Sequence, residues 1–460
     1  MRQQAARRIT FSIVGLTVVK KLDRKNRIDK SKVALVLAGG AISGGAFKLG
    51  GLSALNAYLE TLKVTDFDIY VGCSAGAFLA APLSAGIPPE ELIRSIHGGS
   101  SIISQFRPIH FYSPNFRDFI QKPIQLLRDT VTFWPALFRA LGNSIDSTRG
   151  KKRVKHFFLH PSYPNFERVM TPLIQEVLGT TELRHGGLGY LPPGLFDNRS
   201  IERFIRTNLR RNRLPNNFKL MHLERNNSLY IAATNLNTAG SVLFGHDENT
   251  TASISEAVQA SSAIPGFYRP AKIGTEEFVD GGVRRTANLS SAAAKGADLI
   301  IAYNPFRPCV NLADGHPDSN FRSMAQMGPA VILDQIFRTL LHSRLQLGIQ
   351  KLALDPSFKG NLIVIEPAET DARMFNISPL AFWKRAEAAE AGYISVKETL
   401  ERNHEEISGI LAMSGIRTNL QRLKDDESAL RVARHADEAV FDVLENGLEG
   451  ASNQRFYVVR

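Results

Sequence analysis

The chain has 460 residues, of which 43% are hydrophobic and 22% are charged. This composition is ordinary for a globular protein and excludes a disordered or fibrous chain, and the length allows one large domain with additions or two domains. The two cysteines, Cys73 and Cys309, exclude a disulfide framework and a CxxC metal site and are compatible with a reducing, cytoplasmic compartment.

Much of the net charge of +12 lies in residues 1–32, which hold ten Lys or Arg against two Asp. The segment ITFSIVGLTVV (9–19) is shorter than the roughly 20 apolar residues that span a bilayer, and no signal-peptide cleavage site follows it. Two interpretations stay open for this N-terminal segment (1–31). It is either a basic, apolar segment that lies on an anionic membrane, or a first strand or helix with solvated flanks.

The next stretches repeat one order of elements. KVALVLAGG (32–40) predicts a buried strand that runs into a glycine loop, and residues 44–62 have the apolar spacing of a helix. FDIYVGCSAGAFLAAPLSAG (67–86) again predicts a strand, a small-residue turn and a helix. Two such units in succession predict an α/β fold with a mainly parallel central sheet covered by helices.

Residues 87–225 are less regular and interleave aromatic with basic side chains. This insertion either covers or lines a site or forms a helical layer that closes the core. Beyond it we expect further strands in 228–238, 242–246, 276–283, 297–306 and 361–367, and helices in 254–264, 324–354 and 378–402. Residues 306–460 are therefore expected to form a mostly helical C-terminal region that completes or caps the core.

Ser74 lies in GCSAG (72–76), between a predicted strand and a predicted helix. A serine with glycines two positions away on either side is typical of a sharp turn that exposes a nucleophile at a helix N-terminus. The same spacing also occurs in ordinary tight turns, so Gly72 and Gly76 do not by themselves identify a nucleophile.

The glycine-rich stretch GGAISGG (39–45) ends the preceding strand, and its loop should emerge at the same edge of a parallel sheet. Its backbone amides, those of Gly39, Gly40 and Ala41 first, are candidate donors to an oxyanion. The alternative is a dinucleotide-binding loop, with Glu60 at the distance of a ribose-binding acid. Ala41 breaks the G-x-G-x-x-G spacing of such loops.

The base for the serine proton is the third requirement. None of the 11 histidines lies in a strand-end motif that resembles a triad position, and His435, in a charged helical stretch, is the least unlikely of them. Asp280 ends the predicted strand EEFV and is followed by Gly281 and Gly282, which leave a carboxylate at a strand terminus with little bulk around it.

The three motifs in this order resemble the patatin-like phospholipase family, which uses a glycine-rich oxyanion loop, a GxSxG serine and an Asp in DGG or DGA as a Ser-Asp dyad without histidine. The resemblance covers residues 32–305 and implies a catalytic domain there. It implies that Ser74 is the nucleophile, that Asp280 is its base and that Gly39, Gly40 and Ala41 form the oxyanion hole.

The glycine loop departs from the family pattern GGGxRG. Ala41 stands at the third glycine and Ser43 stands at the arginine, so a fixed positive charge is lost. Alanine keeps its amide, which can still donate if φ is negative. Lys48, Arg284 and Arg285 are the candidates to replace the arginine.

The resemblance implies a serine lipid acyl hydrolase that acts on a phospholipid or another acyl lipid at an anionic membrane, with no cofactor, no metal ion and no nucleic acid partner. Two alternatives stay open. The same dyad could serve an acyltransferase or a thioesterase, and the altered loop is compatible with a weakly catalytic protein that binds lipid or acts as a scaffold.

Overall fold

The computed structural model describes residues 9–11, 15–22, 31–115, 192–311, 323–371 and 373–425, together with isolated positions between 118 and 169. The chain divides into two compact units. The first comprises residues 1–112, 198–264 and 270–460, and the second comprises residues 113–197 and 265–269.

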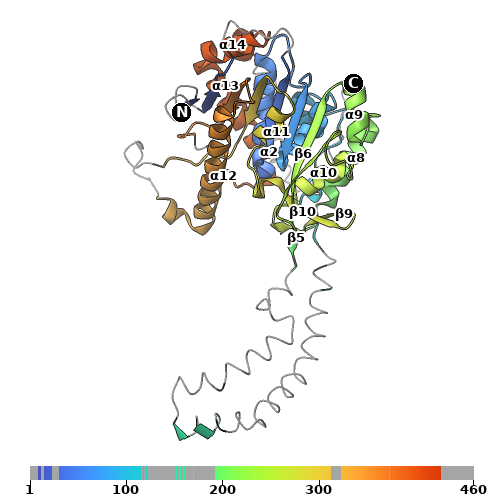
Figure 1. Ribbon diagram of the computed structural model, residues 1–460, viewed down its shortest axis with the longest axis vertical. Coiled ribbons are helices and arrows are strands. Elements are labelled where there is room, and N and C mark those ends of the chain that lie inside the picture. The colour runs from blue at the N-terminus through green and yellow to red at the C-terminus, as the bar shows by residue number, and fades with distance from the viewer. Residues whose placement is uncertain are drawn as a thin grey trace, which may run out of the picture. The chain divides into compact units, whose positions relative to one another are not determined.

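The first unit is built on a ten-stranded mixed sheet (Figure 1). Its path runs through β1 (Ile9–Phe11), β2 (Leu16–Val19), β12 (Asn361–Ile365), β11 (Leu299–Tyr303), β3 (Val33–Leu37), β4 (Ile69–Cys73), β6 (Ser228–Asn235), β10 (Glu276–Asp280) and β9 (Ala271–Ile273), with β7 (Ser241–Phe244) paired to β6. The strands from β12 to β6 are parallel, and the flanking strands are antiparallel. The predicted α/β fold with a mainly parallel centre is confirmed, and the antiparallel flanks are an addition to the prediction.

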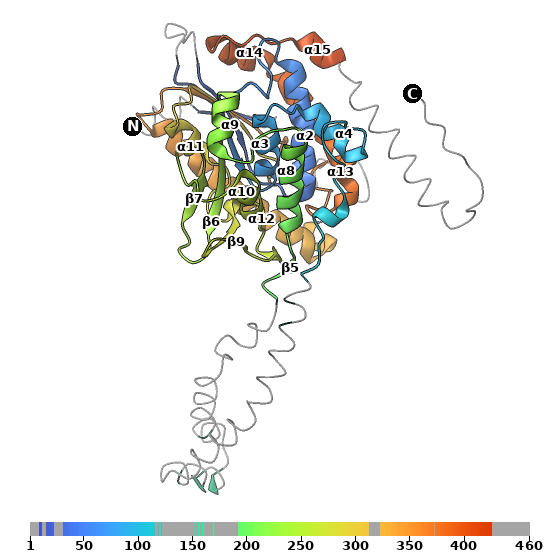
Figure 2. The same cartoon turned by 90° about the vertical axis from the view of Figure 1, so that its right-hand side faces the viewer.

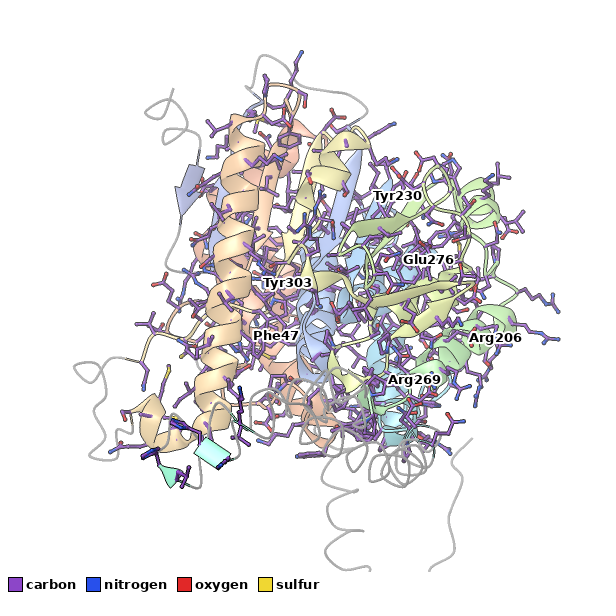
Figure 3. All side chains as sticks on the ribbon, turned by 60° about the horizontal axis from the view of Figure 1, so that its bottom comes forward. Phe47, Arg206, Tyr230, Arg269, Glu276 and Tyr303 are labelled. Atoms are coloured by element: carbon purple, nitrogen blue, oxygen red, sulfur yellow. The ribbon has the colours of Figure 1, made fainter. Side chains whose placement is uncertain are left out.

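Helices cover both faces of this sheet (Figures 1 and 2). On one face, α11 (Leu289–Ala294) and α12 (Pro329–Leu354) pack on a cluster that includes Val36 and Ala302. On the other face, Phe47 of α2 (Ala41–Tyr58) packs on Tyr303, with ring centroids 6.3 Å apart (Figure 3). The central strands are therefore buried on both sides, which explains why their sequences are continuous apolar runs.

The other helices of the described chain mostly lie where the apolar spacing predicts them. They are α3 (Ala75–Ser84), α4 (Pro89–His97), α8 (Arg199–Arg211), α9 (Phe218–Arg225), α10 (Ile254–Ser261), α13 (Arg385–Arg402), α14 (His404–Met413) and α15 (Leu420–Asp425). Several boundaries differ from the predicted ones. Helix α2 runs from Ala41 to Tyr58 rather than over 44–62, so its first three residues are helical rather than part of a glycine loop. Helix α10 ends at Ser261, and α13 begins at Arg385, after a 3₁₀ turn (Phe382–Lys384).

The N-terminal segment contributes strands to the sheet. Strand β2 pairs with β12, and its side chains are buried. Just after it, the Lys21 ammonium donates to the carbonyl oxygens of Leu352 (2.8 Å) and Phe358 (2.9 Å) at the end of α12. Of the two interpretations left open for this segment, membrane contact or a first strand or helix, residues 16–19 fit the second, because they form a buried strand. In the part of the chain that the structure describes, no helix has the length and apolar character to cross a membrane.

The described parts of residues 87–225 in the first unit are largely helical and cover the core, with α4 against α2, α8 against α10 and α9 against β6. At the centre of this layer is an aromatic cluster in which Phe106 lies 4.9 Å from Phe78, 4.4 Å from Phe111 and 4.7 Å from Phe204, measured between ring centroids. Of the two interpretations of this segment, these residues follow the helical layer that closes the core. Most of residues 116–191 lies outside the described residues.

The second unit contains a two-stranded parallel sheet of β5 (Gly194–Phe196) and β8 (Gly266–Tyr268). Phe196 and Phe267 pack with their ring centroids 4.8 Å apart, and the Asn115 amide donates to the Gly194 carbonyl oxygen at 3.0 Å.

Candidate active site

Ser74 is the single residue between β4 and α3, and it has a backbone conformation that residues other than glycine rarely adopt. Its φ is 55° and its ψ is −127°, and its side chain is only 3% exposed. A positive φ costs a non-glycine residue roughly 1–2 kcal/mol. Such strain persists only where the surrounding structure enforces it, and at a strand-to-helix turn it is the conformation that presents a nucleophilic serine.

The flanking glycines are required by close backbone approaches. A Cβ on Gly76 would lie 2.1 Å from the Leu37 carbonyl oxygen, at the end of the neighbouring strand β3. A Cβ on Gly72 would lie 2.5 Å from the Ala77 Cα. The GxSxG spacing thus has a steric reason in this fold, because the turn packs against β3 and against its own helix.

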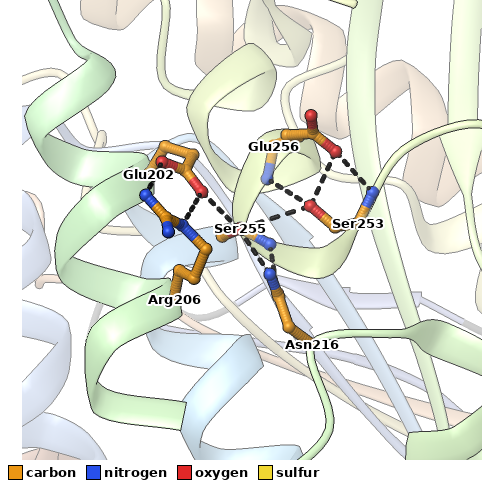
Figure 4. A network of polar contacts seen from close by, with 6 residues as sticks. All are labelled: Glu202, Arg206, Asn216, Ser253, Ser255 and Glu256. Carbon is orange, nitrogen blue, oxygen red and sulfur yellow. Dashed lines mark hydrogen bonds and ion pairs between the residues drawn. The ribbon is translucent and has the colours of Figure 1, made fainter. Parts of the chain in front are cut away.

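Ser261, which the sequence analysis did not single out, supports the turn from helix α10. Its hydroxyl accepts from the Ser74 amide at 2.8 Å and donates to the Ala232 carbonyl oxygen at 2.6 Å. The start of α10 is fixed in turn by polar contacts (Figure 4). There the Ser255 hydroxyl donates to Glu202 at 2.9 Å, and the Ser255 amide donates to Asn216 at 2.9 Å.

Asp280 ends strand β10 and lies beside the serine turn. It pairs with Ala233 of β6, while Cys73 pairs with Ala232 on the other side of the same strand. The Ser74 hydroxyl lies near enough to favour the charged form of its carboxylate and so to lower its pKa. The Gly282 amide donates to Asp280 Oδ1 at 2.7 Å, and the Cys73 Sγ lies 3.8 Å from the same oxygen. The structure therefore brings Ser74 and Asp280 together across more than two hundred residues.

Burial governs the protonation of this pair. Loss of solvent raises the pKa of Asp280 above its usual value, although hydrogen bonds from Ser74, Gly282 and Cys73 favour the carboxylate. Burial and the neighbouring Asp280 carboxylate raise the pKa of Cys73 far above its usual range, so Cys73 stays a thiol and a donor. A raised pKa is what a carboxylate needs to act as a base near neutral pH.

Lys48 is fully buried in α2 and takes part in the same electrostatic cluster. Its ammonium donates to the carbonyl oxygens of Ala38 and of Gly39, the latter at 2.9 Å. Burial lowers the pKa of Lys48 to about 7, and the nearby Cys73 and Asp280 act in the opposite direction. Of the three candidates for a replacement charge, Lys48 interacts with Asp280, whereas Arg284 and Arg285 are exposed.

The contacts of Lys48 also orient the two peptide groups that follow β3. In a trans peptide the C=O and N–H bonds point in opposite directions. Because the oxygens of Ala38 and Gly39 point toward Lys48, the amides of Gly39 and Gly40 point away from it. A Cβ on Gly39 would lie 3.5 Å from the Ser74 Cβ, so these peptides pass directly beside the serine.

Ala41 has a φ of 49°, which is the left-handed region and not the negative φ that the sequence analysis required. The family glycine would adopt this conformation without strain. Within the described chain, the amides of Gly39, Gly40 and Ala41 have no hydrogen-bond acceptor, whereas those of Ile42 and Ser43 both donate to the Pro379 carbonyl oxygen, at 3.0 and 3.1 Å. The free donors are therefore the three predicted from the sequence.

The same contacts argue against the dinucleotide alternative. The Pro379 oxygen takes two of the amides of the helix N-terminus, those of Ile42 and Ser43, that would otherwise face a pyrophosphate. Glu60 lies beyond the far end of α2 and faces Arg417, with Oε2 3.6 Å from its Nε. His435 lies outside the described residues, and the described residues contain no group of three or more His, Cys, Asp or Glu that could hold a metal ion.

This fold and this geometry define a class of α/β proteins with a strained serine between a central parallel strand and a helix. Within that class the chain belongs to the patatin-like phospholipase family, whose family model matches residues 35–293, more than half of the chain. Membership implies a lipid acyl hydrolase with acyl-lipid substrates.

Two solved structures show distant similarity. The crystal structure of VipD from Legionella pneumophila is 17% identical, with 96% of this chain and 80% of that chain covered and a TM-score of 0.33. The structure of full-length ExoU in complex with SpcU, from the type III secretion system of Pseudomonas aeruginosa, is 14% identical, with 96% and 74% covered and a TM-score of 0.26. No curated protein sequence matches the chain.

Proposed function

We propose that the protein is a serine hydrolase that cleaves fatty-acyl esters of phospholipids or other acyl lipids, with Ser74 as the nucleophile and Asp280 as its base. The observation that carries this proposal is the position of the buried Ser74, held in a strained turn, beside the buried Asp280 carboxylate, whose charged form it favours. Nucleophile and base need this contact for the proton to leave as the new bond forms.

The reaction has two halves. Ser74 Oγ attacks the ester carbonyl carbon while its proton passes to Asp280, and the carbonyl oxygen becomes an oxyanion. Collapse of this intermediate breaks the ester bond, and the departing alkoxide takes the proton from Asp280, which leaves an acyl-enzyme. A water molecule then attacks the acyl group, gives its proton to Asp280 and releases the fatty acid as Ser74 recovers its hydrogen.

We assign the oxyanion to the amides of Gly39, Gly40 and Ala41, which have no protein acceptor in the described chain. Gly39 lies beside Ser74, since a Cβ on it would be 3.5 Å from the Ser74 Cβ. Donors that are fixed before the reaction lower the barrier because they need no reorganisation as charge develops. Lys48 is a positioning residue in this scheme, since it fixes the peptides that carry the amides of Gly39 and Gly40.

The test is a panel of phospholipids, triacylglycerol and acyl-CoA, assayed for free fatty acid and for acyl transfer to glycerol. Ser74→Ala and Asp280→Asn should each lower hydrolysis by about a thousandfold or more. Ser84→Ala is the matched control, because Ser84 is buried at the far end of the same helix and donates only to Ala81. Equal, slow hydrolysis of every ester by wild type and Ser74→Ala would exclude the proposal.

A further inference from the structure

The first half of helix α12 exposes large apolar side chains on its surface. Five of them, which we call the α12 surface, are between 38% and 61% exposed: Ile332, Leu333, Ile336, Phe337 and Leu340. Ile332, Ile336 and Leu340 are spaced four residues apart, and so are Leu333 and Phe337. The two rows are adjacent and lie on one side of the helix. Contiguous exposed apolar surface of this kind marks an interaction site more often than an ordinary solvated face.

The α12 surface adjoins the loop that follows Asp280. The Thr286 hydroxyl donates to the Leu341 carbonyl oxygen at 2.9 Å, and Arg344 donates to the Val283 carbonyl oxygen at 2.8 Å. Val283, three residues after Asp280, is itself 46% exposed and extends the apolar surface toward the site. Helix α12 lies over one face of the sheet (Figure 1).

The helix is anchored, so the surface is formed before any partner binds. Arg338 is buried on the opposite side, with its Nε 2.7 Å from Asp334 and its guanidinium over the rings of Phe306 (5.4 Å) and Phe375 (5.3 Å). Gln335 accepts from the Cys309 amide at 3.1 Å and donates to the Cys309 carbonyl oxygen at 2.8 Å.

The charges around the surface are basic. Asp334, which is paired with Arg338, is the one acidic residue in the sequence from 323 to 354. Arg284, Arg285 and Arg344 are exposed at the border with the Asp280 loop. A second copy of the chain in a two-fold arrangement would bring these like charges together, whereas anionic lipid head groups would complement them.

We propose that the α12 surface inserts into the interfacial layer of an anionic bilayer and thereby presents Ser74 to lipid substrate. The inference rests on the proposed lipid hydrolase function, since that function places the substrate in the bilayer. Apolar side chains enter the acyl boundary while the arginines contact phosphates, which is the binding mode of interfacial helices. Within the N-terminal segment (1–31), the other candidate for lipid contact, Leu16–Val19 are buried in the sheet and unavailable for insertion.

The test uses flotation with vesicles of phosphatidylcholine alone and of phosphatidylcholine with phosphatidylglycerol. The variant Leu333→Gln/Phe337→Gln/Leu340→Gln should lose at least tenfold in binding to the anionic vesicles and in hydrolysis of phospholipid within them. Its hydrolysis of a short-chain ester dissolved in water should stay within twofold of wild type. The control Leu220→Gln/Leu223→Gln changes equally exposed leucines on α9 and should keep both activities.

Ser74→Ala separates the two proposals, because it should bind vesicles like wild type while it loses hydrolysis of both substrates. Phe337→Trp gives an independent readout that does not require the triple variant to fold, and its fluorescence should shift to shorter wavelength with anionic vesicles. The inference would be overturned if the triple variant bound vesicles like wild type or if Phe337→Trp showed no fluorescence shift. It would also be overturned if wild type bound neutral and anionic vesicles equally, or if the triple variant converted a dimer to a monomer.

Discussion

The Lys48 ammonium lies 2.9 Å from the Gly39 carbonyl oxygen, and through this contact a residue of helix α2 sets the direction of a peptide beside Ser74. The Gly39 carbonyl oxygen points toward Lys48. Because the C=O and N–H bonds of a trans peptide point in opposite directions, the amide of the next residue, Gly40, points away from Lys48. Through its contacts with the Ala38 and Gly39 carbonyl oxygens, Lys48 orders the two peptides that follow β3.

Lys48→Met should lower kcat by about tenfold to a hundredfold and leave KM nearly unchanged, because the oxyanion donors act only as charge develops. Lys63→Met is the matched control, since Lys63 also donates to two carbonyl oxygens of the α2 region, those of Asn56 and Leu59, at the far end of the helix. Steady-state kinetics on a soluble ester would contradict this role if both variants lost the same activity.

The buried Lys48 should also make stability depend on pH. Its pKa is about 7 in the folded protein and 10.5 as the usual value, so between these limits the unfolded chain holds a proton that the folded protein lacks. The free energy of unfolding of wild type should therefore rise with pH in this window relative to Lys48→Met, by at most about 1.4 kcal/mol per pH unit. Urea unfolding at pH 7.5, 8.5 and 9.5 measures the two slopes, and equal slopes would contradict the burial of a titrating lysine.

Cys73 should tune the acidic limb of the activity profile. Burial raises the pKa of Asp280, and the Cys73 thiol acts in the opposite direction as a donor to its carboxylate. Activity should fall as the pH drops through this raised pKa, above the usual 3.8 of an aspartate, because the protonated acid cannot accept the serine proton.

Cys73→Ala removes the donor and should move the acidic limb of kcat/KM to higher pH, whereas Cys73→Ser supplies a stronger donor and should move it to lower pH. The pair controls for the loss of the sulfur itself. A shift of both variants in the same direction would mean that packing, rather than the hydrogen bond to Asp280, sets the profile.

The sequence predicted those parts of the site that depend on local order along the chain. The strand before Ser74, its two glycines and Asp280 at a strand end all lie where the motifs put them. Ser261 and Cys73 carry no local signal, because a serine at the end of a short helix and a cysteine at a strand end have many ordinary roles. Their function arises from the pairing of β6 with both β4 and β10.

The first residue of α2 could not be predicted from the sequence either. The stretch GGAISGG (39–45), with four glycines among seven residues, predicts a loop. The Pro379 carbonyl oxygen accepts from the amides of Ile42 and Ser43 and allows the helix to begin at Ala41. This contact joins segments more than three hundred residues apart. The antiparallel direction of the flanking strands has the same origin, since it is set by pairing with a neighbour even where the strand itself, as for β7 and β10, lies in a predicted range.

Ala41→Gly should increase the free energy of unfolding by about 0.5–1 kcal/mol. Glycine removes the roughly 1–2 kcal/mol cost of a positive φ and adds an entropic cost of about 0.5–1 kcal/mol. Ala46→Gly, five residues later in the interior of the same helix, should have the opposite sign because it incurs only the entropic cost and loses a buried methyl group. Chemical denaturation of both variants tests the left-handed conformation of Ala41, and destabilisation by Ala41→Gly would contradict it.

The most direct test of the whole account is covalent labelling with an alkyl fluorophosphonate, in which the nucleophilic oxygen attacks phosphorus and fluoride departs. Intact mass and peptide mapping should find one adduct in wild type, on Ser74. The adduct should be absent in Ser74→Ala and should form much more slowly in Asp280→Asn. Two results would contradict the claim that Ser74 and Asp280 carry the reaction. One is an adduct that persists in Ser74→Ala. The other is a wild-type protein that hydrolyses lipid although the label does not modify its Ser74.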